Sequence, residues 1–242
     1  ALAAWAAALA FPLDQLSRSN VFARMGQAVL VCLVAGPLFW QALPWHGLTA
    51  ALPHRLRNRL TGLALRPSRF SPLLGEATSS IFVWFFYLSA ILIWHDPGYV
   101  EWEIASPLRQ HASLLLLTTA ALLFWQQITR AGPRRYTRAT YVGRVVMLLG
   151  VEIPNVIAGM SIAFRTAPLY AWYTVQPGAE PLMLQQALAQ QSLSGALTWV
   201  FGSLVYITSI VLVVNEAFAR EGFRRDPPAY WDSEERFIAP GL

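Results

Sequence analysis

Two of the four histidines and three of the four methionines of this chain are expected on one side of a membrane, where they could hold a metal ion. His95 ends one apolar stretch and His111 begins the next, so both are expected at the same surface of a membrane. Met25, Met160 and Met183 are expected on that side as well. Imidazole and thioether ligands together suit copper, and Cu(I) in particular. Because no two of these residues have a ligand-like spacing, the alternative is that the histidines are interfacial and the methionines face lipid.

A carboxylate inside an apolar stretch is the second candidate for chemistry. Glu152 lies near the middle of such a stretch, next to Pro154 and Asn155. Burying a carboxylate in hydrocarbon costs several kcal/mol unless it is protonated or paired. Glu152 is therefore either a proton-relay or ligand group, or a neutral or paired side chain that holds a helix contact. We expect the second role, because Pro154 leaves a backbone carbonyl free as a partner.

Motifs of known catalytic sites do not occur in the sequence. There is no GxSxG, HExxH, P-loop or GxGxxG, and the lack of CxxCH excludes covalently attached haem. The single cysteine, Cys32, cannot form an internal disulfide. We therefore expect no enzymatic activity and no cofactor, with copper at His95 and His111 as the open exception.

These residues are carried by a chain with the composition of a membrane protein. Of its 242 residues, 55% are hydrophobic and 13% are charged, and the mean hydropathy is +0.42. A typical soluble domain has about 25% charged residues. The values exclude a soluble globular domain, a disordered chain and a nucleic-acid-binding protein, although the net charge is +5.

The apolar stretches predict membrane spans. A helix needs about 20 apolar residues to cross a hydrocarbon core of about 30 Å. Five stretches are long enough: 25–53, 77–95, 110–129, 145–164 and 181–215. Residues 1–13 are apolar too, but as a helix they reach only about 20 Å. They are either the stub of a sixth span or a surface anchor. Because the chain does not begin with Met, we expect a preceding part to be missing or processed. The predicted fold is an all-α polytopic membrane helix bundle with five full transmembrane helices plus an N-terminal sixth.

The arginines predict the orientation of the bundle. All 18 basic residues are arginines, and most of them fall on one side of the spans. The arginine-rich side holds Arg55, Arg57, Arg59, Arg66, Arg69, Arg130, Arg134, Arg135, Arg138, Arg144, Arg220, Arg224, Arg225 and Arg236. The other side holds Arg18, Arg24, Arg109 and Arg165. Positive charge collects on cytoplasmic loops, so the rich side is expected to be the cytoplasm.

Two polar segments complete the organisation. Within the basic segment 46–75, leucines alternate with His54 and arginines, which suits either an amphipathic helix on the inner membrane surface or a solvated loop. This segment belongs to a transmembrane domain of residues 1–219. Residues 220–242 form a polar cytoplasmic tail that either docks on a partner or is disordered.

Several blocks, in order and spacing, resemble the CtaG-type cytochrome c oxidase assembly family. The first is the run from Ala23 to Leu38, and the second is Trp94-His95-Asp96-Pro97 with Tyr99. The others are Gln110-His111 with Leu122 to Trp125, then Gly159 to Phe164 with Pro168 to Tyr170 and Tyr173, then Gln190-Gln191 with Gly195 and Trp199. The chain departs from the family pattern where histidines are expected, at Arg24, Ala28 and Pro107, and where an acid is expected, at Gln190. The resemblance therefore implies a degenerate member that keeps only His95 and His111.

The resemblance implies a function as well. We expect a bacterial inner-membrane protein that is a non-catalytic partner of a haem-copper cytochrome c oxidase. It would act in assembly, through maturation of the copper centre, or as an accessory structural subunit of a respiratory complex. Its partners would be membrane lipid and oxidase subunits, with no nucleic acid. The alternative is a copper or small-solute membrane permease, which an internal repeat would favour.

The arginine asymmetry generates a topology prediction. A fusion reporter that is active only outside the cytoplasm, attached after Leu242, should stay silent because the chain is expected to end in the cytoplasm. The measurement is reporter activity in intact cells, with the same reporter inserted after Asp96 as the active control. Activity at Leu242 would reverse the whole orientation.

Overall fold

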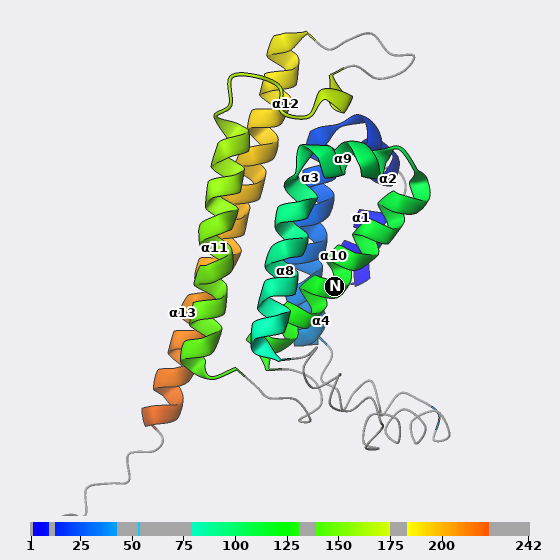
Figure 1. Cartoon of the computed structure of the whole chain (residues 1–242). Helices are drawn as coiled ribbons and strands as arrows, with labels where there is room; N and C mark the ends of the chain where they lie inside the picture. Colours follow the sequence, from blue (N-terminus) through cyan, green and yellow to red (C-terminus); the bar gives the residue numbers. More distant parts are fainter. Residues whose placement is uncertain are drawn as a thin grey trace, which may run out of the picture.

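The computed structural model describes residues 2–9, 13–42, 53, 79–130, 139–174 and 183–222. All regular elements in these ranges are helices, and there is no strand among them (Figure 1). The N-terminal elements are α1 (Leu2–Leu9), α2 (Leu13–Ser19), α3 (Val21–Val29), η1 (Leu30–Ala35) and α4 (Gly36–Ala42). The others are α8 (Ser80–His95), α9 (Pro97–Ile104), α10 (Pro107–Thr129), α11 (Tyr141–Ala163), η2 (Ala171–Tyr173), α12 (Leu184–Ala196), η3 (Leu197–Phe201) and α13 (Gly202–Gly222). The predicted all-α polytopic membrane helix bundle is confirmed.

Two predicted segments cannot be compared with the structure. The basic segment 46–75 lies outside the described residues except for Pro53, and so does the tail beyond Gly222. Both interpretations stay predictions.

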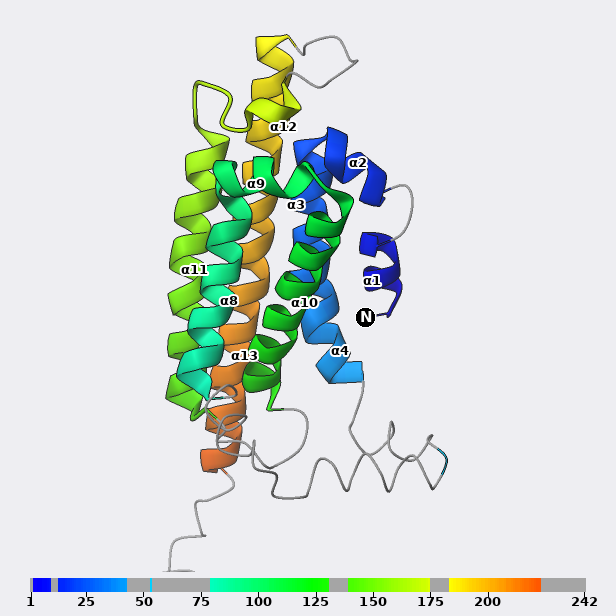
Figure 2. The same cartoon turned by 45° about the vertical axis from the view of Figure 1, so that its right-hand side comes forward.

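The long helices form a closed ring. The continuous helix α3–η1–α4 packs on α10, α10 packs on α8, α8 touches α11, and α11 runs beside α12–η3–α13, which returns to α3 (Figures 1 and 2). The helices α2 and α9 lie at one end of the ring. We call this the Arg24 end, because it contains Arg24, and the opposite end the Arg144 end. The sequence predicts that the Arg24 end faces outward and the Arg144 end faces the cytoplasm.

Among the described residues, four helices are long and apolar enough to cross a membrane: Val21–Ala42, Pro107–Thr129, Tyr141–Ala163 and Leu184–Arg220. The predicted second span differs, because α8 has 16 residues and joins α9 at an angle of 77°. The pair counts as a fifth span only if both helices are taken together. The chain turns at Asp96, because Pro97 disfavours helical geometry at the preceding residue and Asp96 caps the next helix.

The predicted sixth span corresponds to α1, a helix of eight residues. It packs against η1, in the middle part of the first long helix, and Trp5 contacts Phe39 with ring centroids 5.1 Å apart. The amide of Gln27 donates to Ala8 O at 2.6 Å. These contacts lie along the bundle rather than on its end surface, so they favour the stub of a span over a surface anchor.

Two long helices contain a π-helical turn, and both turns receive a side chain from another helix. In η1, the amide of Gly36 bonds Val31 O, five residues back. The next π-type donor would be Pro37, which has no N–H. The carbonyl of Cys32 is left free and accepts from the Trp125 indole at 2.6 Å. In η3, the carbonyl of Thr198 accepts from the Asn155 amide at 3.4 Å.

The interior of the ring is filled by aromatic side chains. Tyr87 stacks on Phe124 with centroids 4.3 Å apart, and Trp125 is parallel to Tyr206 with centroids 6.2 Å apart. The hydroxyls of Tyr87 and Tyr206 are 3.0 Å apart and share a hydrogen bond. The bundle therefore has a packed core, while many large apolar side chains on its outside are exposed, as expected for a lipid-facing surface.

Small residues allow the helices to approach closely. A Cβ built on Gly195 would lie 2.5 Å from Gly159 O and from Ala163 N, so α11 and α12 cross in backbone contact there. Glycines within or beside the predicted spans indicate close helix contacts in the sequence: Gly36, Gly143, Gly150, Gly159, Gly195 and Gly202. The structure confirms this for all of them except Gly143, whose nearest neighbours are Thr140 and Ala139 at the start of its own helix.

The crossing at Gly195 generates a stability prediction. Gly195→Ala should lower the melting temperature of the detergent-solubilised protein, because overpacking against fixed backbone costs about 1–3 kcal/mol. The matched control is Gly26→Ala, whose new Cβ would have its nearest neighbour, Leu197 Cδ2, at 4.0 Å. Because Ala has a higher helix propensity than Gly, the Gly26→Ala control should not lower the melting temperature. Equal melting temperatures for the two variants would contradict the close crossing.

Candidate functional site

A buried ion pair lies at the centre of the Arg24 end. The Arg24 guanidinium contacts Glu103 Oε2 at 2.7 Å, and the two side chains are 1% and 0% exposed. The same guanidinium donates to Trp94 O at 3.1 Å and lies over the Trp94 ring, 4.0 Å from its centroid. Removing two charges from water is costly, so their mutual attraction and these added contacts must offset the loss of hydration.

The turn between α8 and α9 positions this pair. Asp96 Oδ1 accepts from Tyr99 N at 2.8 Å, which caps α9 and fixes the direction in which it leaves. On α9, Val100, Glu103 and Ile104 share the buried face, so Glu103 is brought to Arg24. The last carbonyls of α8 have no partner within their helix. The Trp94 carbonyl is one of them, and the partial negative charge of a helix C-terminus favours a cation such as Arg24.

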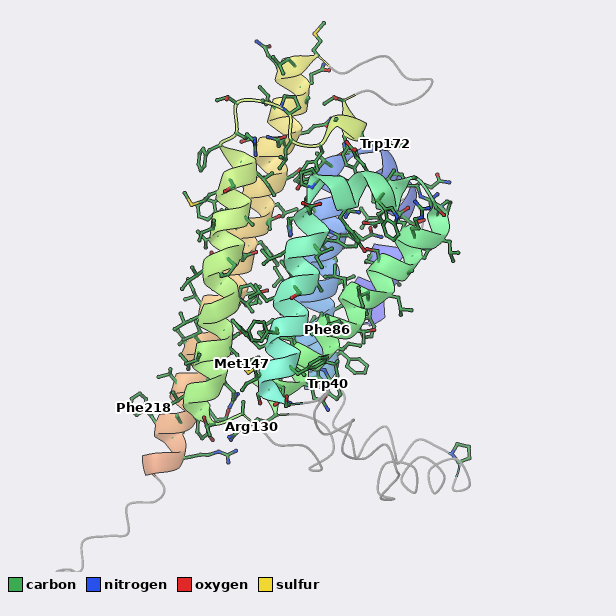
Figure 3. All side chains as sticks on the ribbon, viewed as in Figure 1. Trp40, Phe86, Arg130, Met147, Trp172 and Phe218 are labelled. Carbon is green, nitrogen blue, oxygen red and sulfur yellow. The ribbon has the colours of Figure 1, made fainter. Side chains whose placement is uncertain are left out.

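A loop between α11 and α12 packs against the same end. Tyr170 donates to His95 O at 3.0 Å, and Tyr173 donates to Ser17 O at 2.9 Å. Trp172 donates to Arg18 O at 3.1 Å (Figure 3). Burial raises the pKa of both tyrosines above their ordinary value, so the two hydroxyls remain protonated donors at neutral pH. The loop therefore joins α2 and α8 to the helices that carry it.

One glutamine holds this loop in place. Gln191 accepts from Leu169 N at 2.6 Å and donates to Ile162 O at 3.1 Å. It is the neighbour of Gln190, where the family pattern has an acid. Gln191 thus has a structural role within the chain, in the block that carried the resemblance.

The two histidines have different surroundings. His95 Nδ1 is 2.7 Å from Ile91 O, and since a carbonyl only accepts, Nδ1 carries the proton. His95 Nε2 is then an acceptor, and it is buried without a partner in the described part of the chain. His111 is 55% exposed, with Nε2 at 3.6 Å from Asp14 Oδ1. The structure records no contact between the two imidazoles across the described residues.

The three methionines also lie in different surroundings. Met25 is fully buried in an apolar cluster with Tyr170 and Tyr173, whereas Met160 and Met183 are exposed. Within the described ranges no group of three or more His, Cys, Asp or Glu residues could hold a metal ion. Copper binding at His95 and His111 stays a prediction.

The intramembrane polar residues lie at a helix interface. Glu152 and Asn155 are buried on α11, where Ser203 and Asn155 are the hydrogen-bonding neighbours of the Glu152 carboxyl. A Cβ on Gly202 would collide with the Asn155 amide, which shows how closely α13 approaches. This arrangement suits a helix contact, although the role of Glu152 stays a prediction.

A small cavity lies between these groups. Its volume is about 30 Å³, and its lining includes His95, Cys32, Asn155 and Tyr206 among apolar side chains. A single water molecule fits a space of this size. The cavity is therefore too small for a solute larger than a water molecule or a single ion.

Sequence reasoning missed Glu103. In the sequence it is one of several acids, with Glu101, on the side that has few arginines, and its charge alone does not single it out. The spacing of Val100, Glu103 and Ile104 is that of one helical face, and with Pro97 as a helix start this was a usable signal. Arg24 was assigned to the correct end, but its pairing was not foreseen.

Comparison with known proteins gives one match. The sequence model of the family described as "Cytochrome c oxidase caa3 assembly factor" matches residues 1–220. No curated protein and no solved structure matches the chain.

The ion pair generates a stability prediction. Arg24→Met should destabilise the protein by about 3–5 kcal/mol, because Glu103 is left buried and unpaired. The double variant Arg24→Met with Glu103→Leu should recover most of this loss, and thermal unfolding in detergent measures both. Arg18→Met is the control, since it removes only the half-exposed 3.5 Å pair with Asp14 and should cost less than about 1 kcal/mol. A double variant no more stable than Arg24→Met would contradict the pairing.

Proposed function

The chain belongs to the cytochrome c oxidase caa3 assembly factor family, and from that membership we propose that it is a non-catalytic partner of the oxidase subunits that does not itself carry copper. A role in cytochrome c oxidase assembly follows from the family description. The finer points, contact with oxidase subunits and the absence of a copper-carrying step, are the proposal. The protein acts within the membrane, as its multi-pass helices require.

The observation that carries the proposal is the ion pair of Arg24 and Glu103. Arg24 stands where the family resemblance leads one to expect a histidine. Its guanidinium fills the buried centre of the Arg24 end, and the carboxylate there is already neutralised at 2.7 Å. A copper ion at the same place would be repelled by the fixed cation and would have to displace it from Glu103.

The settings of the two remaining histidines support the same conclusion. His111 is exposed beside Asp14, while the Nδ1 of His95 is engaged with its own helix. Met160 and Met183, which could complete a copper site, are on the exposed surface. The packed aromatic core and the cavity of about 30 Å³ argue against a permease for small organic solutes.

A groove on the bundle is suited to a partner helix. It has a volume of about 500 Å³ and lies between α3–η1 and η3, with Ala23 and Gly26 on one side and Leu197 and Phe201 on the other. A Cβ on Gly26 would meet nothing closer than 4.0 Å, so the backbone is accessible there. In a bilayer, small residues allow a second helix to approach closely. We assign this groove to a transmembrane helix of an oxidase subunit.

The proposal predicts that oxidase contact and copper content are independent. Tagged protein purified in mild detergent should retain oxidase subunits, identified by mass spectrometry, and should contain no stoichiometric copper by metal analysis. The double variant His95→Ala with His111→Ala should retain the same subunits. Gly26→Phe, which fills the groove, should lose them.

Three outcomes would contradict the proposed function. About one copper per chain, abolished by the double histidine substitution, would restore a copper-carrying function. Failure to retain any oxidase subunit after crosslinking in the native membrane would refute the partner role. Retention by Gly26→Phe equal to that of the unmodified protein would refute the groove as the contact surface.

A further inference from the structure

A second groove opens at the Arg144 end, between the first turns of α8 and α11. Its volume is about 350 Å³. Ser80, Ile81 and Trp84 line it from α8, and Thr140, Val146 and Met147 line it from α11. In Figure 3, Met147 lies between these two helices and Arg130 lies beyond their lower ends. Neither the proposed function nor the copper question involves this groove.

The inner end of the groove is closed by Trp84. Its indole donates to Met147 O at 3.1 Å, and its ring rests on Gly150, where a Cβ would lie 2.7 Å from Trp84 Cζ2. From Thr140 to Met147 the helix rises by about 10 Å. The groove therefore runs about 10 Å from the membrane surface towards the middle and stops there.

The lining changes from polar to apolar along this depth. Ser80 and Thr140 stand at the mouth, at the starts of the two helices. Ile81, the residue after Ser80, is apolar and 73% exposed, and Val146, further along α11, is apolar and 60% exposed. The first amides of each helix point outward at the mouth and favour an anion there. An occupant must therefore have a polar, anionic end and an apolar end.

Arg130 supplies a full positive charge at the mouth. Its guanidinium donates to Ala139 O at 3.0 Å and lies over the Tyr141 ring, 4.5 Å from the centroid. Ala139 also lines the groove. Arg130 has no carboxylate partner in the part of the chain that the structure describes. By contrast, Arg144 and Arg220 both contact Glu216, at 2.8 and 3.2 Å.

Arg130 also differs from Arg144 and Arg220 in its backbone conformation. It ends α10 with φ 53° and ψ 22°, the left-handed conformation that glycine adopts without cost at helix ends. A larger residue there costs about 1 kcal/mol or more. The Arg130 side chain is held beside the groove by Tyr141 and Ala139.

We propose that this groove binds one anionic phospholipid, with the phosphate at Arg130 and the helix starts, and the upper part of an acyl chain along Ile81 and Val146. The charge complementarity at the mouth and the apolar walls below it both fit this occupant. The lipid would join α8 to α11 where, apart from Trp84, few side chains link the two helices.

Lipid selectivity tests the proposal. Delipidated protein in mild detergent is mixed with equal amounts of phosphatidylglycerol and phosphatidylcholine that have the same chains, and native mass spectrometry counts the bound molecules. The unmodified protein should prefer phosphatidylglycerol. Arg130→Gln should reduce that preference about fivefold, the factor that corresponds to about 1 kcal/mol per basic residue near a membrane surface. The control Arg220→Gln should leave the preference unchanged, because Arg220 is exposed and paired with Glu216.

A pair of matched tryptophan variants tests the groove itself. Val146→Trp fills the groove from an exposed position and should reduce the binding of both lipids. Ile157→Trp lies on the same helix, is also exposed and is remote from the groove, so it should bind as the unmodified protein does. Equal binding by the two variants, or an unchanged preference in Arg130→Gln, would overturn the proposal. A dimer that Val146→Trp abolishes would show that a second copy, and not a lipid, fills the groove.

Discussion

A polar group in hydrocarbon must find its hydrogen bond within the protein, and this requirement determines how the helices of this bundle are joined. Three tryptophan indoles meet it by donating to a backbone carbonyl of another helix. The indoles of Trp40, Trp84 and Trp125 donate to Leu122 O at 2.8 Å, Met147 O at 3.1 Å and Cys32 O at 2.6 Å. Each bond joins two different helices. Together with the close glycine contacts, these bonds fix the positions of the helices along one another.

The same requirement explains why the Arg24 end is closed rather than open. The helix α8 stops at His95 because of the proline that follows, and its last carbonyls need donors. Arg24 and Tyr170 donate to two of them. Arg24 then needs a counter-charge, which Glu103 supplies. The ion pair is thus connected to a broken helix, and it is part of the packing of the Arg24 end.

The fold class could be predicted from the sequence because apolar stretches of about 20 residues have few other uses. Asn20 caps the start of α3 and Thr140 caps the start of α11, so the true boundaries lie a few residues before the apolar runs. Side-chain partners could not be predicted. Trp94 lies at the end of a predicted span, where tryptophans often face the membrane interface, but here it is buried beneath Arg24. Whether a polar residue near a membrane surface faces water or a buried partner depends on the tertiary contacts, and Glu103 was misjudged for that reason.

The shortness of α8 has a consequence for the surrounding lipid. Its 16 residues rise about 24 Å, against about 30 Å for a typical hydrocarbon core. Beyond α8, the chain continues at an angle as α9. Trp102 on α9 is 51% exposed, and the Arg109 guanidinium lies over its ring, 4.9 Å from the centroid. Hydrophobic mismatch of this size is relieved by local thinning of the bilayer. We therefore expect the bilayer to be thinner beside α8 than beside the longer helices, which would give the protein a preferred side for neighbours with short hydrophobic spans.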